Sequence, residues 1–125
     1  MPDTGMPRKI LLVVDNSLLI IERLISILKE VKAVEKILTA TDYAAAVKIL
    51  RENKTDIVLL DIQLPGKNGI ELLKFIVKTY PAVKVVMLSN LVSEYYQKLC
   101  KKIGAADFID KSKDFDLIPE VVATL

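Results

Sequence analysis

Two kinds of hydrophobic pattern alternate along this chain, and the alternation limits the possible folds more than any other feature. Short continuous apolar runs are typical of strands buried on both faces of a sheet, whereas apolar residues repeated every three or four positions are typical of helices. The runs predicted as strands are Lys9–Val14, Glu35–Ala40, Asp56–Leu60, Val83–Leu88 and Asp107–Ile109. A strand, a helix and a second parallel strand form a right-handed unit. The sequence therefore predicts an α/β fold, a doubly wound five-stranded parallel sheet with five helices.

Residues suited to helix termini lie between these runs. Ser17 and Asp42 carry the side-chain oxygen that an N-cap needs. Pro81 ends the third predicted helix, Gly104 suits the end of the fourth, and Pro119 fits the first turn of the fifth. The predicted buried faces are Leu18, Ile21, Leu24, Ile25 and Leu28 in the first helix, Ala46, Val47 and Leu50 in the second, and Ile70, Leu73, Val77 and Tyr80 in the third. The last two helices are predicted over Glu94–Ile103 and Leu117–Leu125.

Length and composition predict one domain. The 125 residues are 52% hydrophobic, enough to fill one core. We expect residues 8–125 to form the domain and residues 1–7 to be a disordered N-terminal tail. A net charge of +2 with scattered lysines argues against nucleic acid as a partner, and no apolar run approaches the roughly 20 residues that cross a membrane. The single cysteine, Cys100, favours a reducing compartment, so we expect a cytoplasmic protein.

The chain contains no histidine. This composition excludes Ser-His-Asp and Cys-His catalysis, and it excludes zinc sites that depend on imidazole. Nucleophilic and acid–base chemistry is left to Asp, Glu, Lys, Ser or Tyr. If a phosphohistidine serves as a donor, it has to belong to another protein.

Polar side chains follow four of the predicted strands at their carboxyl ends, where open parallel sheets form their sites. They are Asp15 and Asn16, Asp61, Ser89 and Asn90, and Asp110 and Lys111. Phosphoryl transfer to a carboxylate suits this set, because an aspartate can act as the nucleophile and the transition state needs cations around the phosphoryl oxygens. The expected Mg²⁺ ligands are Asp15, Asn16, Asp61 and a backbone carbonyl near Gln63. Lys111 and the Ser89 hydroxyl would bind the remaining phosphoryl oxygens.

Four segments at these strand ends resemble the bacterial response-regulator receiver domain of two-component signalling, in its stand-alone single-domain type. They are Val13–Asn16, Asp56–Gly69, Val86–Ser89 and Gly104–Lys111. The resemblance implies a flavodoxin-like fold with strand order 2-1-3-4-5. It implies Asp61 as the phospho-acceptor, a catalytic Lys111, and a switch made of Ser89 and Phe108. It also implies a signalling face built from the fourth helix, the fifth strand and the fifth helix.

Three residues depart from the family's pattern. Asn16 stands where an acid usually touches the metal directly, so we expect Mg²⁺ binding to be weaker by about 10- to 100-fold but not lost. Asn90 stands where a smaller residue is common, next to the switch serine, and is expected to crowd Asp61 or to alter its dephosphorylation. Ser112 replaces a proline that is often cis, so a trans bond and a locally different loop are expected.

The function expected from this resemblance is a phosphorylation-dependent signalling switch and not a turnover enzyme. Asp61 would receive a phosphoryl group from a histidine kinase or a phosphotransfer protein. Ser89 would then move toward it, Phe108 would turn inward, and the face near Tyr95 and Tyr96 would change for a separate downstream protein. The fourth-helix face is also a possible homodimer contact, and no membrane or nucleic-acid partner is expected.

Three alternative functions can be weighed against the sequence. A pseudo-receiver would keep the fold as a phosphorylation-independent protein-interaction module, and Asn16 favours it. A hydrolase of the aspartyl-phosphate type would need a second acid two residues after its nucleophile. Asp15 is followed by Asn16 and Ser17, and Asp61 by Ile62 and Gln63, so neither position fits. A flavin-binding module would need a phosphate loop rich in Ser, Thr and Gly, which the sequence lacks.

Overall fold

The computed structural model describes residues 8–90 and 93–125. The strands are β1 Lys9–Val14, β2 Val34–Ala40, β3 Ile57–Asp61, β4 Lys84–Ser89 and β5 Asp107–Asp110. The helices are α1 Leu18–Leu28, α2 Tyr43–Glu52, α3 Gly69–Thr79, α4 Glu94–Ile103 and α5 Ile118–Thr124, with a 3₁₀ turn η1 at Phe115–Leu117. The tail predicted for residues 1–7 lies outside the described residues.

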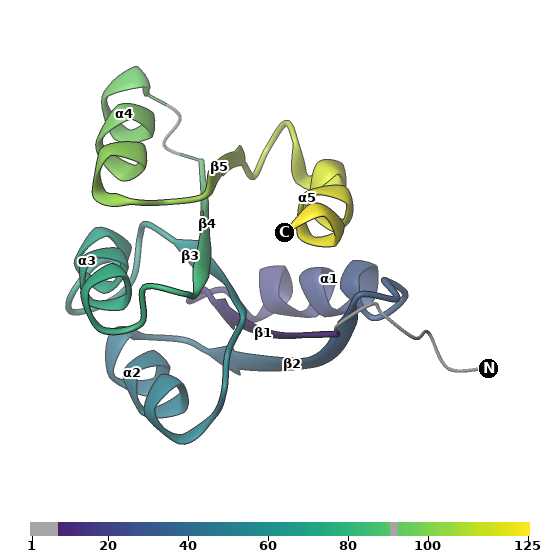
Figure 1. The fold of residues 1–125 in the computed structure, drawn as a ribbon. Coiled ribbons are helices and arrows are strands. Elements are labelled where there is room, and N and C mark those ends of the chain that lie inside the picture. Colours follow the sequence, from purple (N-terminus) through teal and green to yellow (C-terminus); the bar gives the residue numbers. More distant parts are fainter. Residues whose placement is uncertain (1–7, 91–92) are drawn as a thin grey trace.

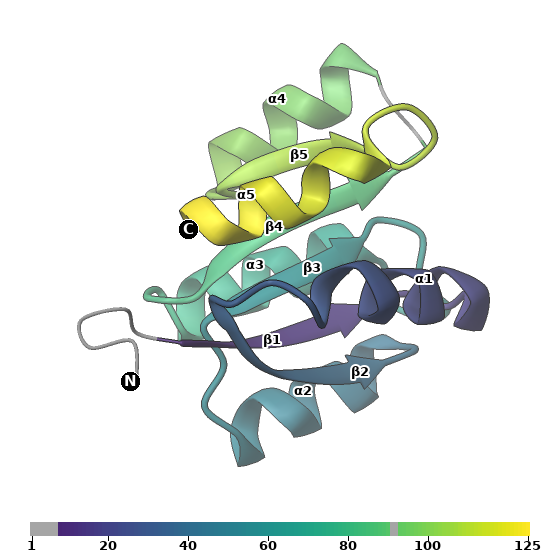
Figure 2. The ribbon, with the colours of Figure 1, turned by 90° about the vertical axis from the view of Figure 1, so that its right-hand side faces the viewer.

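The sheet has the order β2-β1-β3-β4-β5 with parallel pairing throughout, so the predicted fold and strand order are confirmed. Helices α2, α3 and α4 cover one face of the sheet, and α1 and α5 cover the other (Figure 1). The strand ends that carry the predicted polar residues all lie at the same edge, to the right in Figure 2. This edge is the one at which parallel sheets form their sites.

Each central strand contributes to two cores, which explains its continuous apolar run. Leu12 and Val14 of β1 pack beneath α2, α3 and α4, while Leu11 and Val13 pack beneath α1 and α5. All four side chains are 0% exposed. A strand that alternates between two buried faces needs an apolar residue at every position, and only its last residue is available for polar chemistry.

The predicted N-caps are confirmed. The Ser17 hydroxyl accepts a hydrogen bond from the Ile20 N–H at 3.3 Å, and the Asp42 carboxylate accepts one from the Ala45 N–H at 2.8 Å. Pro119 lies in the first turn of α5, as predicted, but that helix is shorter than expected because η1 replaces its beginning. Within the described residues, no helix is long and apolar enough to span a membrane.

Three predicted buried faces need correction. Leu18 is 68% exposed, because the first turn of α1 extends past the ends of the strands and has no sheet beneath it (Figure 2). In α3 the fully buried side chains are Leu72, Leu73 and Ile76. The predicted members Ile70, Val77 and Tyr80 are half-buried on its flanks, as is Val47 in α2. The sequence of α3 is apolar on more than one side, so periodicity alone did not identify the stripe that meets the sheet.

The loop after β3 is fixed by a close backbone approach at Gly69. The Gly69 N–H donates to the Ile62 carbonyl at 2.7 Å, and a Cβ built on Gly69 would lie 2.0 Å from the Asp61 carbonyl oxygen. Only glycine allows α3 to begin this close to the end of β3. The first turn of α3 therefore holds the backbone of Asp61 in place.

Gly69→Ala should lower the free energy of unfolding by about 2–3 kcal/mol, because the methyl group forces the end of β3 away from α3. Urea unfolding followed by circular dichroism would measure the change. Gly66→Asn is the matched control, since Gly66 has φ +75 with open space around it and asparagine tolerates that conformation. Equal losses in both variants would contradict the role assigned to Gly69.

Candidate functional site at the strand ends

Backbone pairing brings the predicted residues to one edge of the sheet. Asp15 directly follows β1, and its N–H continues the ladder by donating to the Ala40 carbonyl at 3.1 Å. Asp61 and Ser89 are the last residues of β3 and β4, one position later in the strands than predicted. The Lys111 N–H donates to the Ser89 carbonyl at 3.0 Å, which holds the start of the lysine side chain beside β4.

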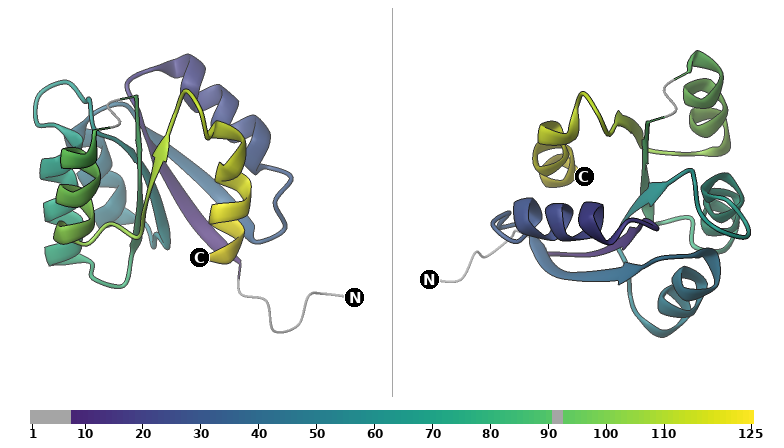
Figure 3. Two further views of the ribbon diagram at one scale, coloured as in Figure 1. Left: turned by 90° about the horizontal axis from the view of Figure 1, so that it is seen from above. Right: turned by 180° about the vertical axis from the view of Figure 1, so that it is seen from behind.

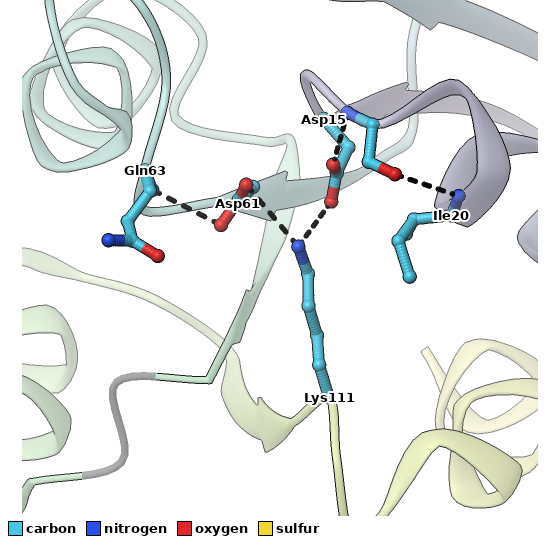
Figure 4. A network of polar contacts seen from close by, with 6 residues as sticks. Asp15, Ile20, Asp61, Gln63 and Lys111 are labelled. Carbon is cyan, nitrogen blue, oxygen red and sulfur yellow. Dashed lines mark hydrogen bonds and ion pairs between the residues drawn. The ribbon is translucent and has the colours of Figure 1, made fainter.

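The Lys111 ammonium group lies between two buried carboxylates (Figure 4). It forms an ion pair with Asp15 Oδ2, and it lies 3.3 Å from Asp61 Oδ2. The exposed fractions of the three side chains are 8% for Lys111, 1% for Asp15 and 6% for Asp61. The second oxygen of each carboxylate accepts a backbone N–H: Asp15 Oδ1 from Ser17 at 2.8 Å, and Asp61 Oδ1 from Gln63 at 3.1 Å.

One ammonium group for two carboxylates leaves the buried cluster with a formal charge of −1. Burial raises the pKa of Asp61, because desolvation disfavours the charged carboxylate. The positive charge of Lys111 lowers this pKa, the negative charge of Asp15 raises it further, and the Gln63 N–H lowers it. Since burial has the largest effect, the cluster favours any additional positive charge that reaches it.

One open pocket lies over the two carboxylates. Asp15, Asn16, Asp61, Gln63 and Lys111, all predicted as site residues, line it together. Ser89 is fully buried at the end of β4. The set offers carboxylate and amide oxygens, the ligands that a hard divalent cation prefers. The described residues contain no group of three or more His, Cys, Asp or Glu side chains placed to hold a metal ion, so any ion here depends on two acids and neutral oxygens.

Two of the three departures from the family pattern lie on this pocket as exposed amides. Asn16 and Asn90 both line it, from the segments that follow β1 and β4. Neither side chain is buried, so each is available to a ligand or a partner. The effect of Asn90 on access to Asp61 stays a prediction.

The third departure lies in the loop after Lys111. The bond between Lys111 and Ser112 is trans, as expected for a residue other than proline. Asp110 Oδ1 accepts hydrogen bonds from the Ser112 N–H at 2.9 Å, the Ser112 hydroxyl at 2.7 Å and the Lys113 N–H at 3.3 Å. The hydrogen bond from the hydroxyl lowers the pKa of the exposed Asp110 carboxyl. Asp110 thus organises the turn after Lys111.

Phe108 lies away from the carboxylates, on the α4 side of β5. Its ring is half-buried and lines a pocket with Gln97 and Lys101 of α4. At the start of α4, Tyr95 is 68% exposed and Tyr96 is half-buried against the core, with ring centroids 5.3 Å apart. The structure therefore places these three rings on the face formed by α4 and β5.

Sequence reasoning missed Arg23, which lines the pocket that contains Asp61. Its guanidinium carbon lies 4.2 Å from the centroid of the Phe115 ring. Arg23 belongs to no motif, and it stands 92 positions from Phe115 in the chain, so no local pattern could have revealed the contact.

A family model, curated relatives and solved structures all match this chain. A family model described as the response regulator receiver domain matches residues 11–123. The protein-glutamate methylesterase/protein-glutamine glutaminase of Pyrococcus abyssi is 38% identical over 114 residues, which are 89% of this chain and 30% of that protein. The chain spans about half or less of the length of the first curated relatives that it matches.

Solved structures agree with the sequence matches. The response regulator domain of Thermotoga maritima CheB has a TM-score of 0.82 at 32% identity, covering 94% of this chain and 92% of that chain. The Mn²⁺-bound form of the response regulator Rcp1 has a TM-score of 0.78 at 21% identity, covering 93% and 90%, a likeness of fold alone. With the model match over residues 11–123, this chain belongs to the receiver-domain family of the response regulators of two-component signalling.

Proposed function

We propose that this receiver accepts a phosphoryl group on Asp61 from a histidine kinase or phosphotransfer protein, and that the product changes its α4–β5–α5 face. The observation that carries the proposal is the ammonium group of Lys111 between the buried carboxylates of Asp15 and Asp61. Burying a carboxylate is costly unless a cation or hydrogen bonds compensate its charge, and Asp61 has Lys111 beside it. A buried, cation-paired carboxylate on an open pocket is typical of a functional site.

Asp61 has the position of a nucleophile. One of its oxygens attacks the phosphorus of the donor, a P–O bond forms, and the P–N bond to the donor imidazole breaks with its electron pair remaining on nitrogen. Lys111 stabilises the charge on the phosphoryl oxygens, since its ammonium group already lies 3.3 Å from Asp61 Oδ2. The chain has no histidine of its own, so the donor imidazole comes from a partner.

The donor set of the pocket fits Mg²⁺, the ion that receiver domains typically bind. Asp15 and Asp61 would hold it with the amide oxygen of Asn16 and the backbone carbonyl of Gln63. The charge of −1 on the buried cluster supports this assignment. When bound, the ion supplies positive charge to the phosphoryl oxygens. Asn16 contributes no charge, so we propose that the affinity is reduced.

A route for the signal runs from β4 to β5. Ser89 is in register with Asp110, and Met87 is in register with Phe108. We propose that the Ser89 hydroxyl moves to donate a hydrogen bond to the phosphoryl group, and that the half-buried Phe108 ring then turns inward. The pocket between Phe108 and α4 supports this movement because it leaves room for the ring. A partner that prefers the new face, including a second copy of this chain, would read the change.

The compartment proposed for this exchange is the cytoplasm. Cys100, the single cysteine of the sequence, is a free thiol buried on α4, which supports a reducing environment. The matched segment is a signalling module, and the esterase activity named for the Pyrococcus relative belongs to a protein of which this chain covers 30%.

One competing function has an observation in its favour. A pseudo-receiver would use the same fold to bind a partner without phosphorylation. Asn16 supports this alternative, because it leaves the pocket with two acids, Asp15 and Asp61. The intact contact of Lys111 with both acids favours the phosphorylation switch instead.

Incubation with acetyl phosphate and Mg²⁺ should add one phosphoryl group, about 80 Da, because Asp61 is the nucleophile. Intact mass spectrometry would detect it. Asp61→Asn should abolish the adduct, whereas Asp116→Asn, which alters an exposed aspartate in η1, should retain it. No adduct on the wild-type protein at saturating Mg²⁺ would favour the pseudo-receiver.

Asn16→Asp should tighten Mg²⁺ binding by about 10- to 100-fold, since it adds a charge beside the ion. Isothermal titration calorimetry would measure the dissociation constants. Asn90→Asp adds the same charge elsewhere on the pocket and should have a much smaller effect. Equal gains from the two substitutions would show that Asn16 is not a ligand position.

Without divalent cations at pH 7, Asp61→Asn should raise the free energy of unfolding by about 1 kcal/mol, because it removes one of two buried charges that share a lysine. Lys111→Met should lower it by about 3 kcal/mol, since both carboxylates lose their cation. The double variant should recover part of that loss. Urea unfolding would measure all three.

The pH dependence of this gain follows from the raised pKa of Asp61. The folded state binds the Asp61 proton more tightly than the unfolded state, so protonation favours folding. The gain in unfolding free energy from Asp61→Asn should therefore be complete above the pKa of Asp61 in the folded protein. It should disappear as the pH falls toward 3.8, the ordinary pKa of an aspartate. An advantage that persisted at acidic pH would contradict burial as its cause.

A further inference from the structure

Arg23 connects α1 with the segment that precedes α5. These two helices lie side by side on one face of the sheet (Figure 3). The guanidinium carbon of Arg23 lies 4.2 Å from the ring centroid of Phe115, and this ring is only 6% exposed. The contact with this buried ring limits the positions that the guanidinium group can take.

The same arginine lines the pocket over the phospho-acceptor site. It shares this pocket with Asp61, Asn90, Lys111 and Ser112. The ammonium group of Lys111 already serves two carboxylates. Arg23 forms no ion pair with a carboxylate among residues 8–90 and 93–125. Its side chain is exposed, so its charge is available to an incoming anion.

With its central carbon over the ring, the guanidinium group keeps N–H groups at its edge that can donate to another acceptor. Those N–H groups form a planar fork that matches two oxygens of a phosphoryl group. A stacked arginine is therefore held in place and still able to bind a phosphoryl dianion. Lysine, with a compact ammonium group, would keep the charge but lose the fork.

We propose that Arg23 binds the phosphoryl group of the incoming phosphodonor at the rim of the pocket, before transfer to Asp61. This inference rests on the proposed function, because it assigns a donor-binding residue to the same site. Lys111 is buried beside the acceptor oxygens and acts during transfer, whereas Arg23 is exposed and acts on capture. Arg23 therefore lowers the donor concentration needed for half-maximal phosphorylation and has little effect on the maximal rate.

The test measures the rate of phosphorylation against donor concentration at saturating Mg²⁺, by intact mass spectrometry. Arg23→Gln should raise the half-saturating acetyl phosphate concentration by about 5- to 10-fold and leave the maximal rate within about twofold. The half-saturating concentration of Arg23→Lys should lie between those of the wild-type protein and Arg23→Gln. Arg51→Gln is the matched control, because it removes an equal charge from the exposed side of α2, which covers the other face of the sheet, and it should leave both constants unchanged.

Two further readouts separate donor binding from a structural role. Added salt should raise the half-saturating concentration of the wild-type protein more than that of Arg23→Gln, since the variant lacks the charge that salt screens. Phosphoramidate should give the same ratio between wild type and variant as acetyl phosphate, because the donors share only the phosphoryl group. A ratio seen with acetyl phosphate alone would overturn the proposal, because the contact would then be to the leaving group.

A purely structural contact predicts a different result. If Arg23 only joins α1 to the Phe115 turn, Arg23→Gln lowers the urea midpoint and leaves the half-saturating concentration equal to that of Arg51→Gln. That outcome overturns the inference about Arg23 while leaving phosphorylation of Asp61 intact. A wild-type protein that takes no phosphoryl group would instead refute the proposed function, and the inference with it.

Discussion

The contact of Lys111 with Asp15 and Asp61 joins the ends of three segments that are far apart in the chain. Asp15 and Lys111 are separated by 96 positions, and their side chains meet below the surface. Two neighbouring buried carboxylates repel one another and have lost their hydration, and this cation offsets both costs. The edge of the sheet can therefore hold its acids in place only because the segment after β5 returns a lysine to them.

Parallel pairing makes this return possible. Asp61 of β3 is in register with Leu88 of β4, and Ser89 of β4 is in register with Asp110 of β5. The polar residues at the ends of neighbouring strands therefore lie close together. The glycine at position 69 lets α3 begin against the Asp61 carbonyl. The backbone of Asp61 is thus held by contacts with β4 and α3, while its side chain lines the pocket. The proposed acceptor is therefore fixed through its backbone and lies on an open pocket.

The pocket has a buried group of charges and an exposed positive charge. The deepest groups, Asp15, Asp61 and Lys111, sum to −1 and favour a divalent cation. Arg23 lines the same pocket in contact with Phe115, and we propose that it offers its positive charge to an anionic donor. Asn16 is uncharged where the family pattern usually has an acid. A receiver built in this way would bind its metal less tightly and rely more on cations that the protein itself supplies.

The sequence alone determined the order of the elements, the parallel sheet and the polar residues at the strand ends. These features follow from local periodicity and from the rule that parallel strands form sites at their carboxyl ends. Only the tertiary structure decided which stripe of α3 is buried, that Leu18 lies beyond the sheet, that Lys111 serves two acids, and that Arg23 stacks on Phe115. Each of these depends on contacts between residues distant in the chain. Local patterns carry no information on such contacts, because packing sets them when the helices settle on the sheet.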